Sequence, residues 1–290
     1  NNIDLAIVID FFKNLFKHFS NSNTFQEGAA LAYYSVFSIL PMIMILIAIF
    51  GLLWGEQSVS GEIYQELKGI LGDQGASQLQ DLIKSQHQQH NSKITALIGF
   101  STLALGATGM FNQLHTSFNN IWNIKSKPRN SFLFYLSKHA ISFTIIVLLF
   151  LVITLSLSIN SFLTKHSSAS SNLFSLLIWE LLIAYFLMAF LFALMFKFVG
   201  DAKVHWKVSL LGGLFTSLLF LIGKYLIGLY IGHSKISSTF GSASLLALLM
   251  VWVYYTSQII FMGASFVKVF SKTVDLPIVP SKDGEVKIQD

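Results

Sequence analysis

Residues 243–267 read ASLLALLMVWVYYTSQIIFMGASFV, a run without a charged side chain. A helix of about 20 apolar residues spans the roughly 30 Å hydrocarbon core of a bilayer, because each residue adds about 1.5 Å along the axis. The run lacks the alternation of apolar and polar residues that a strand of a membrane barrel needs. It therefore predicts a membrane-spanning α-helix.

Further stretches of the chain are as long and as apolar. They cover residues 29–54, 94–112, 140–162, 173–196 and 208–231. The only charged side chains inside them are Glu180 and Lys224. A helix satisfies its own backbone hydrogen bonds in lipid, so each stretch predicts a helix. We expect an all-α polytopic membrane protein with six transmembrane helices.

The composition agrees with a membrane protein. Of the 290 residues, 53% are hydrophobic and 11% are charged, and the mean hydropathy is +0.63. A soluble domain carries roughly 25% charged residues, so this chain has too little polar surface for water. The absence of cysteine excludes a disulfide framework and a thiolate metal site.

The basic residues indicate the orientation. Most Lys and Arg lie in the N-terminal segment, in the second and fourth connections and in the C-terminal segment, all on one predicted side. By the positive-inside rule, both termini lie in the cytoplasm. This topology accounts for the net charge of +5, so no nucleic-acid partner is expected.

The segments outside the spans have patterns of their own. Residues 3–19 predict an interfacial helix, which either packs on the ends of the bundle or contacts lipid. Residues 55–93 predict a small external cap of two short amphipathic helices. We expect one membrane domain over residues 1–272 and a mobile cytoplasmic tail over 273–290.

Several motifs occur in a fixed order along the chain. They are EGAALAYYSVFSILP at 27–41, GATGMFNQL at 106–114, FNNIW at 118–122, DAKVHW at 201–206, FGS at 240–242, WVYYTSQ at 252–258 and Gly263-Ala264. Their order and spacing over residues 25–272 resembles the YihY/BrkB family of bacterial inner-membrane proteins, formerly labelled ribonuclease BN-like.

The resemblance implies a six-helix protein of the bacterial inner membrane, with lipid or envelope transport among the functions proposed for members. The chain departs from the family pattern at one position. After Gly263-Ala264 many members have Glu, whereas this chain has Ser265. A mechanism that uses this carboxylate would be lost or altered here.

Two charges inside predicted spans are candidate functional residues. Glu180 and Lys224 each lie about 10 Å from the outer end of consecutive helices, so they are placed to pair. Charged groups in hydrocarbon usually face the bundle interior and find partners. The pair is interpreted either as part of a polar pathway or proton-sensitive switch, or as a structural pair from which Lys224 snorkels outward.

Other residues indicate a bend, close packing and polar lining. Pro41, near mid-bilayer, is expected to kink the first span, which either opens a cavity or fits a neighbour. Small residues that allow close helix packing are Gly106, Gly109, Gly228 and Gly232. Polar residues that either line a cytoplasm-facing cavity or join helices by hydrogen bonds are Tyr254, Tyr255, Gln258, Asn112 and Gln113.

No catalytic constellation is recognised. The eight His residues form no zinc-protease or two-metal nuclease motif, so we expect no metal, no cofactor, no enzyme activity and, in particular, no ribonuclease activity.

We predict a non-enzymatic transporter of lipid or another amphipathic envelope component. An ion or small-solute channel and a scaffold for envelope machinery stay as alternatives. Membrane lipids are the expected partners, and homo-oligomers or envelope proteins stay as alternative partners. Basic groups expected near inner-leaflet headgroups are Lys125, Lys127, Arg129 and Lys203.

Overall fold

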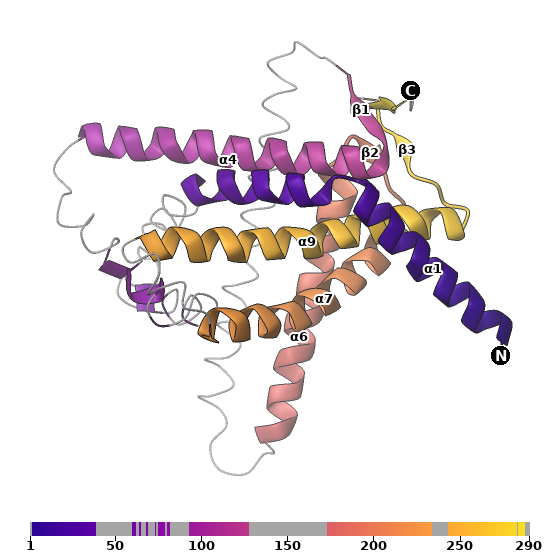
Figure 1. Ribbon diagram of the computed structural model, residues 1–290, viewed down its shortest axis with the longest axis horizontal. Helices are drawn as coiled ribbons and strands as arrows, with labels where there is room; N and C mark the ends of the chain where they lie inside the picture. The colour runs from indigo at the N-terminus through magenta and orange to yellow at the C-terminus, as the bar shows by residue number, and fades with distance from the viewer. Residues whose placement is uncertain are drawn as a thin grey trace. The chain divides into compact units, whose positions relative to one another are not determined.

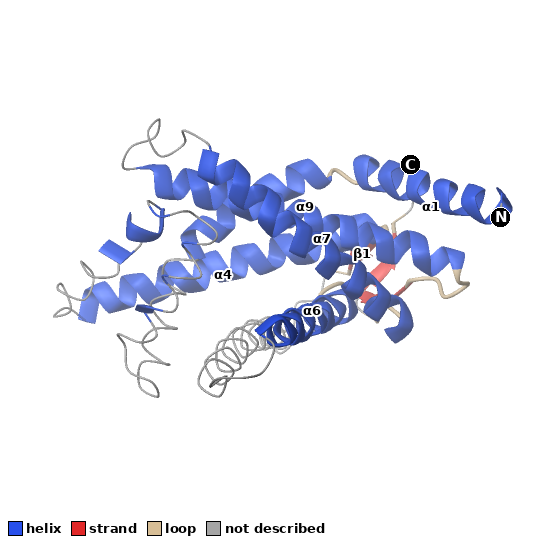
Figure 2. Cartoon of the chain, turned by 90° about the horizontal axis from the view of Figure 1, so that it is seen from below, coloured by secondary structure: helices blue, strands red, loops and turns tan. Residues whose placement is uncertain are grey.

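The computed structural model describes residues 2–38, 93–127, 173–233, 243–282 and 284–287, with single positions between 60 and 81. Helices dominate these residues (Figures 1 and 2). They are α1 (Asn2–Asn21), α4 (Lys93–Trp122), α6 (Leu173–Phe198), α7 (Trp206–His233) and α9 (Ser244–Thr273), and residues 24–38 are helical too. The strands are β1 (Ile124–Ser126), β2 (Ala202–Lys203), β3 (Val279–Pro280) and β4 (Gly284–Val286).

Three helical stretches in the described part of the chain are long and apolar enough to cross a membrane. They are Leu181–Phe198, Trp206–Ile231 and Ser244–Thr273. They overlap the predicted spans at 173–196, 208–231 and 243–267. Large apolar side chains on α6 and α7 are exposed, including Phe186, Phe190, Leu218 and Leu229. Exposed apolar faces of this size are expected where lipid replaces water as the solvent.

The other predicted spans and the cap are described only in part. The predicted span at 94–112 lies within α4, and the span at 29–54 is described only to residue 38. The span at 140–162 lies outside the described residues, as do Pro41 and most of the cap at 55–93. The helical membrane class is therefore confirmed, and the count of six spans stays a prediction.

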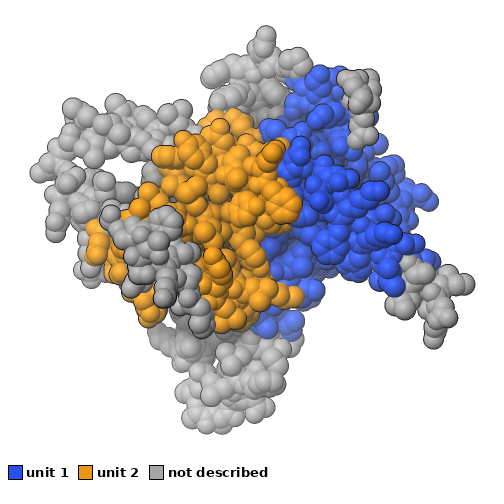
Figure 3. Space-filling view, in the orientation of Figure 1, with its two compact units in different colours: residues 1–24, 115–221, 259–290 blue, residues 25–114, 222–258 orange. Residues whose placement is uncertain are grey.

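The described chain divides into two compact units (Figure 3). Unit 1 comprises residues 1–24, 115–221 and 259–290, and unit 2 comprises residues 25–114 and 222–258. Helices α4, α7 and α9 each contribute to both units. One membrane domain over residues 1–272 stays a prediction.

The segment after α9 is built into unit 1 by two short antiparallel ladders. β3 pairs with β2, and β4 pairs with β1, with Ile124 opposite Val286. Outside the ladders, the Ser281 amide donates to the Asp201 carbonyl at 2.9 Å and the Lys287 amide donates to the Asn123 carbonyl at 3.0 Å. In this arrangement the backbone groups of the described part of the segment find partners in the α4–β1 and α6–α7 connections. The mobility expected for the tail over 273–290 stays a prediction.

Glycine lets two helices of unit 1 approach closely. A Cβ added at Gly213 of α7 would lie 2.1 Å from the carbonyl oxygen of Ala189 in α6. Main-chain atoms cannot move aside as a flexible side chain can, so only glycine fits this position. Close backbone approach at small residues is a main source of helix association in lipid, where apolar burial adds little.

Helix α1 joins unit 1 through aromatic contacts and one polar contact. The Phe11 ring packs edge-on against Phe266, with ring centroids 5.5 Å apart. His18 Nε2 lies 2.9 Å from the Ile121 carbonyl oxygen at the end of α4. Burial lowers the pKa of His18 below its ordinary value, although the bond to Ile121 opposes this shift.

We predict that Gly213→Ala lowers the stability of the protein by about 1–3 kcal/mol, because the new methyl group forces α6 and α7 apart. Thermal unfolding in detergent measures the effect. Gly61→Ala is the control, since no atom of the described residues lies within 4 Å of its added Cβ. Equal midpoints for the two variants would contradict the close contact.

We predict that the protein loses stability as the pH falls below the ordinary histidine pKa of about 6.5. The folded state holds His18 neutral and the unfolded state takes up the proton, so acid favours unfolding. Unfolding midpoints between pH 7.5 and 5.5 test this. His18→Gln keeps a side-chain donor and should show a smaller drop than the unchanged protein. An identical drop in both proteins would rule His18 out as the cause.

Candidate anion-binding cavity

A buried carboxylate organises the end of α4 and the connection between α6 and α7. The Asp201 carboxylate accepts hydrogen bonds from Ser126 Oγ at 2.5 Å and from Asn119 Nδ2 at 3.0 Å. His115 Nε2 lies 3.1 Å from its other oxygen. The Asp201 amide in turn donates to Asn119 Oδ1 at 2.9 Å. We call Asp201, Asn119, His115 and Ser126 the Asp201 cluster.

Three members of the Asp201 cluster are almost free of solvent, whereas Ser126 is exposed. The side chains of His115 and Asp201 are 7% and 6% exposed, and the Asn119 residue is 3% exposed. A buried carboxylate is costly unless donors surround it, and here they come from α4 and β1. The cluster therefore holds these elements to the short segment that carries Asp201.

Trp122 joins the same end of α4 to α9. Its indole Nε1–H donates to the Ala264 carbonyl at 3.1 Å, and its side chain is fully buried. Lys268 Nζ donates to the Trp122 carbonyl at 2.7 Å. That carbonyl lies at the C-terminus of α4, where helices lack internal donors and a cation is favourable. The chain then turns at Asn123, whose φ of 57° is one that asparagine tolerates.

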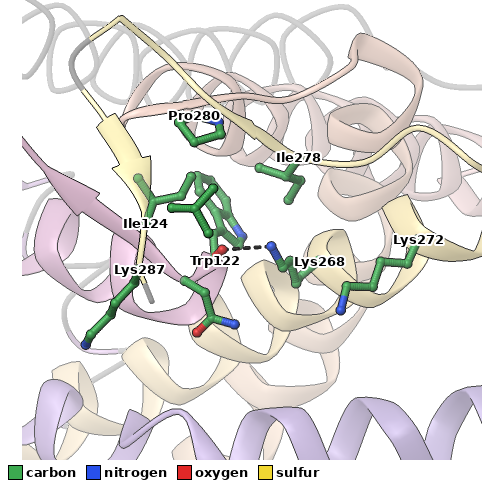
Figure 4. Close-up of a pocket in the computed structure, with 9 residues that line it drawn as sticks. Trp122, Ile124, Lys268, Lys272, Ile278, Pro280 and Lys287 are labelled. Carbon is green, nitrogen blue, oxygen red and sulfur yellow. Dashed lines mark hydrogen bonds between the residues drawn. The ribbon is translucent and has the colours of Figure 1, made fainter. Parts of the chain in front are cut away.

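A cavity of about 330 Å³ lies beside this junction (Figure 4). Its walls come from the α4–β1 junction, the end of α9 and the returning C-terminal segment. The lining residues are Trp122, Asn123, Ile124, Lys268, Lys272, Ile278, Pro280, Val286 and Lys287. Three are lysines and none of these lining residues is acidic, whereas the rest of the wall is mostly apolar. The cavity therefore suits an anion that carries an apolar part.

The three lysines have different roles in the wall. Figure 4 shows Lys268 directed at the Trp122 carbonyl, and a dashed line marks their hydrogen bond. Lys272 lies one turn further along α9 and is exposed. Lys287 comes from the residue after β4 and is also exposed. Lys272 and Lys287 are therefore the lysines best placed to receive a ligand from solution.

Sequence reasoning counted these three lysines only as charges of the cytoplasmic side. Lys287 lies in the segment after α9, and the pairing of β4 with β1 brings it back to the wall that contains Lys268. Of the basic groups expected at headgroups, Lys125, Lys127 and Lys203 are exposed in unit 1, and Arg129 lies outside the described residues.

Unit 2 brings two of the predicted polar residues to one short segment. The Gln113 side-chain amide donates to the Glu27 carboxylate. A Cβ added at Gly28 would lie 2.1 Å from Gln258 Nε2, so Gln258 packs on the next residue. Glu27 was not among the predicted site residues, although it begins the first quoted motif. Within unit 2, Gln113 of α4 thus bonds to residue 27 and Gln258 of α9 contacts residue 28.

The remaining polar candidates are less enclosed. Asn112 is exposed, whereas Tyr254 and Tyr255 are half-buried on α9. Lys224 is exposed on α7, and the side chain of Glu180 lies outside the described residues. The Glu180–Lys224 pair therefore stays a prediction. Ser265 is fully buried, and its hydroxyl has no hydrogen-bond partner within the described part of the chain.

The glycines predicted for close packing differ in what surrounds them. A Cβ at Gly106 would lie 3.0 Å from the Ser38 amide nitrogen, and one at Gly109 would lie 2.5 Å from the Tyr34 ring. Both positions bring α4 against the helical residues 24–38. Gly228 is half-buried on α7, and the surroundings of Gly232 lie outside the described residues.

We predict that Asp201→Asn lowers the unfolding midpoint, with a loss of about 1–3 kcal/mol, because the new amide presents donors to groups that need an acceptor. Glu285→Gln on β4 removes a charge in the same isosteric way from an exposed position and should leave the midpoint unchanged. Thermal unfolding of both variants in one detergent is the measurement. A stable Asp201→Asn protein would show that the cluster does not hold unit 1 together.

Comparison with known proteins gives a family but no structural precedent. A family model described as Virulence factor BrkB matches residues 15–283. Curated relatives named UPF0761 membrane protein include one from Saccharophagus degradans, 24% identical over 267 residues, which cover 90% of this chain and 60% of the relative. The relative from Haemophilus influenzae is 25% identical over 257 residues, which cover 86% of this chain and 90% of the relative. The relative from Mannheimia succiniciproducens is 25% identical over 279 residues, which cover 94% of this chain and 92% of the relative.

No solved structure matches the chain. The chain spans about three-fifths of the Saccharophagus relative and nine-tenths of the Haemophilus one. The family model covers nearly all of the sequence, including every motif on which the resemblance was based. The chain is therefore a membrane protein that belongs to the BrkB family.

Proposed function

We propose that this protein is a non-enzymatic transporter of lipid, or of another amphipathic envelope component, in the bacterial inner membrane. The observation that carries the proposal is the cavity beside Trp122, which combines ammonium groups with apolar side chains. Phospholipids have the same combination, since an anionic phosphate is joined to acyl chains.

The chemistry of the wall favours this ligand class. Ammonium groups form charge-assisted hydrogen bonds with phosphate oxygens, and these bonds are stronger than neutral ones. Trp122, Ile124 and Ile278 offer an apolar surface next to the lysines. A volume of about 330 Å³ accommodates a headgroup and the first part of an acyl chain but not a whole lipid. The acyl chains would therefore extend along the exposed apolar helices.

The predicted topology is consistent with this proposal. The end of α9 and the C-terminal segment carry many of the lysines, so the positive-inside rule assigns this end to the cytoplasmic side. Headgroups of the inner leaflet would then be within reach of the cavity, and the anionic lipids of that leaflet would be attracted to it. An ion channel would instead need a continuous polar route through the bilayer.

Lipid movement in reconstituted vesicles tests the proposal. The purified protein is placed in vesicles that contain a trace of fluorescent phosphatidylglycerol, and dithionite quenching reports the movement of this lipid between leaflets. We predict that the protein speeds this movement and that Lys272→Glu slows it about tenfold, as expected for the loss of one charge-assisted bond. Lys282→Glu is the matched control, an exposed lysine of the same segment that does not line the cavity.

Each outcome has a clear meaning. Acceleration by the unchanged protein and by Lys282→Glu, but not by Lys272→Glu, supports transport through the cavity. No acceleration by a folded, unchanged protein contradicts lipid transport. Equal acceleration by all three proteins keeps transport but excludes the cavity as its site.

A further inference from the structure

Helix α1 has a face that packs against the rest of unit 1. Phe11, Leu15 and Phe19 recur at four-residue intervals and so lie along one side of the helix. Leu15 is 1% exposed, and Phe11 also contacts the Phe270 ring at 6.4 Å. His18 reaches the Ile121 carbonyl from the same side. These contacts fix the rotation of α1 about its own axis.

A second apolar face of α1 has no such cover within the described residues. Ile9, Phe12 and Phe16 follow the i, i+3, i+7 spacing of a single stripe, and they are 56%, 43% and 59% exposed. The stripe lies next to the packed face. On its other side are Lys13 and Lys17, which are exposed and spaced by one turn. Around the helix, the order is therefore packed face, apolar stripe, lysines.

We propose that the stripe of Ile9, Phe12 and Phe16 is inserted into the boundary between headgroups and acyl chains of the bilayer, with α1 parallel to the membrane surface. In this position the apolar side chains enter the acyl region. Lys13 and Lys17 extend to phosphate groups at the level of the headgroups, as long basic side chains do at membrane interfaces.

Lipid is the occupant that fits the charge pattern and the setting. The protein is a membrane protein, so acyl chains and anionic headgroups surround it. A stripe of large apolar residues beside lysines is typical of helices that lie in the membrane interface. The contact adds to the proposed transport function and does not depend on it, since no residue of the stripe lines the cavity.

The absence of cysteine allows a direct test. Single-cysteine variants of the full chain, Phe12→Cys and Phe16→Cys, are labelled with a nitroxide and reconstituted in vesicles of phosphatidylcholine and phosphatidylglycerol. The control is Asn14→Cys, an exposed position on the polar face of the same helix. Spin-label relaxation then reports collisions with oxygen, which concentrates in lipid, and with a water-soluble nickel chelate.

At positions 12 and 16 we expect oxygen collisions to exceed nickel collisions several-fold, and at position 14 we expect the reverse. Nickel collisions that dominate at all three positions would overturn the proposal, because the stripe would then face water. Low collisions with both reagents, together with spin–spin broadening that grows with the protein-to-lipid ratio, would also overturn it, because a second copy would then cover the stripe. Unchanged thermal midpoints confirm that the labelled variants are folded.

Discussion

The Asp201 carboxylate is the constraint on which unit 1 depends. It is buried, so its charge is tolerated only while Ser126, Asn119 and His115 surround it. These partners lie on α4 and β1, and the Asp201 carbonyl also accepts from Ser281 of the C-terminal segment. One residue therefore links three parts of the chain. Two of these parts, the α4–β1 junction and the C-terminal segment, also line the cavity.

Helix packing in this protein rests on close backbone contact more than on the burial of large side chains. Lipid is as apolar as leucine, so placing leucine between helices gains little free energy. Gly213 lets α6 and α7 meet at their main chains, and Gly106 does the same for α4 and the helical residues 24–38. Large apolar residues of α6 and α7 are left on the surface, as expected where lipid is the solvent.

Two surfaces of unit 1 combine apolar and basic groups, at different scales. The cavity combines them within one concave wall, which suits the headgroup of a single amphipathic molecule. On helix α1 the exposed apolar stripe lies beside Lys13 and Lys17, an arrangement that suits the surface of a bilayer. His18 links the two, because it joins α1 to the Ile121 carbonyl next to Trp122 in the wall. A helix held at the membrane surface would thus keep the cavity at a constant depth.

The sequence by itself determined the class of this protein and the position of its long helices. Apolarity over about 20 residues is a local property, and a helix in lipid needs no partner to satisfy its backbone. For this reason the predicted spans at 173–196, 208–231 and 243–267 coincide with α6, α7 and α9. The motifs FNNIW and DAKVHW also contain the residues Asn119 and Asp201, but nothing in their spacing indicates that they bond to each other.

The tertiary structure decided the cavity and the course of the C-terminal segment. β1 to β4 are two or three residues long, too short to show any periodic pattern, and their pairing joins residues far apart in the chain. Lys287 becomes part of the same wall as Lys268 only because β4 returns to β1. Contacts of this kind depend on which buried donors and acceptors meet in space, and that information is not contained in any single stretch of the sequence.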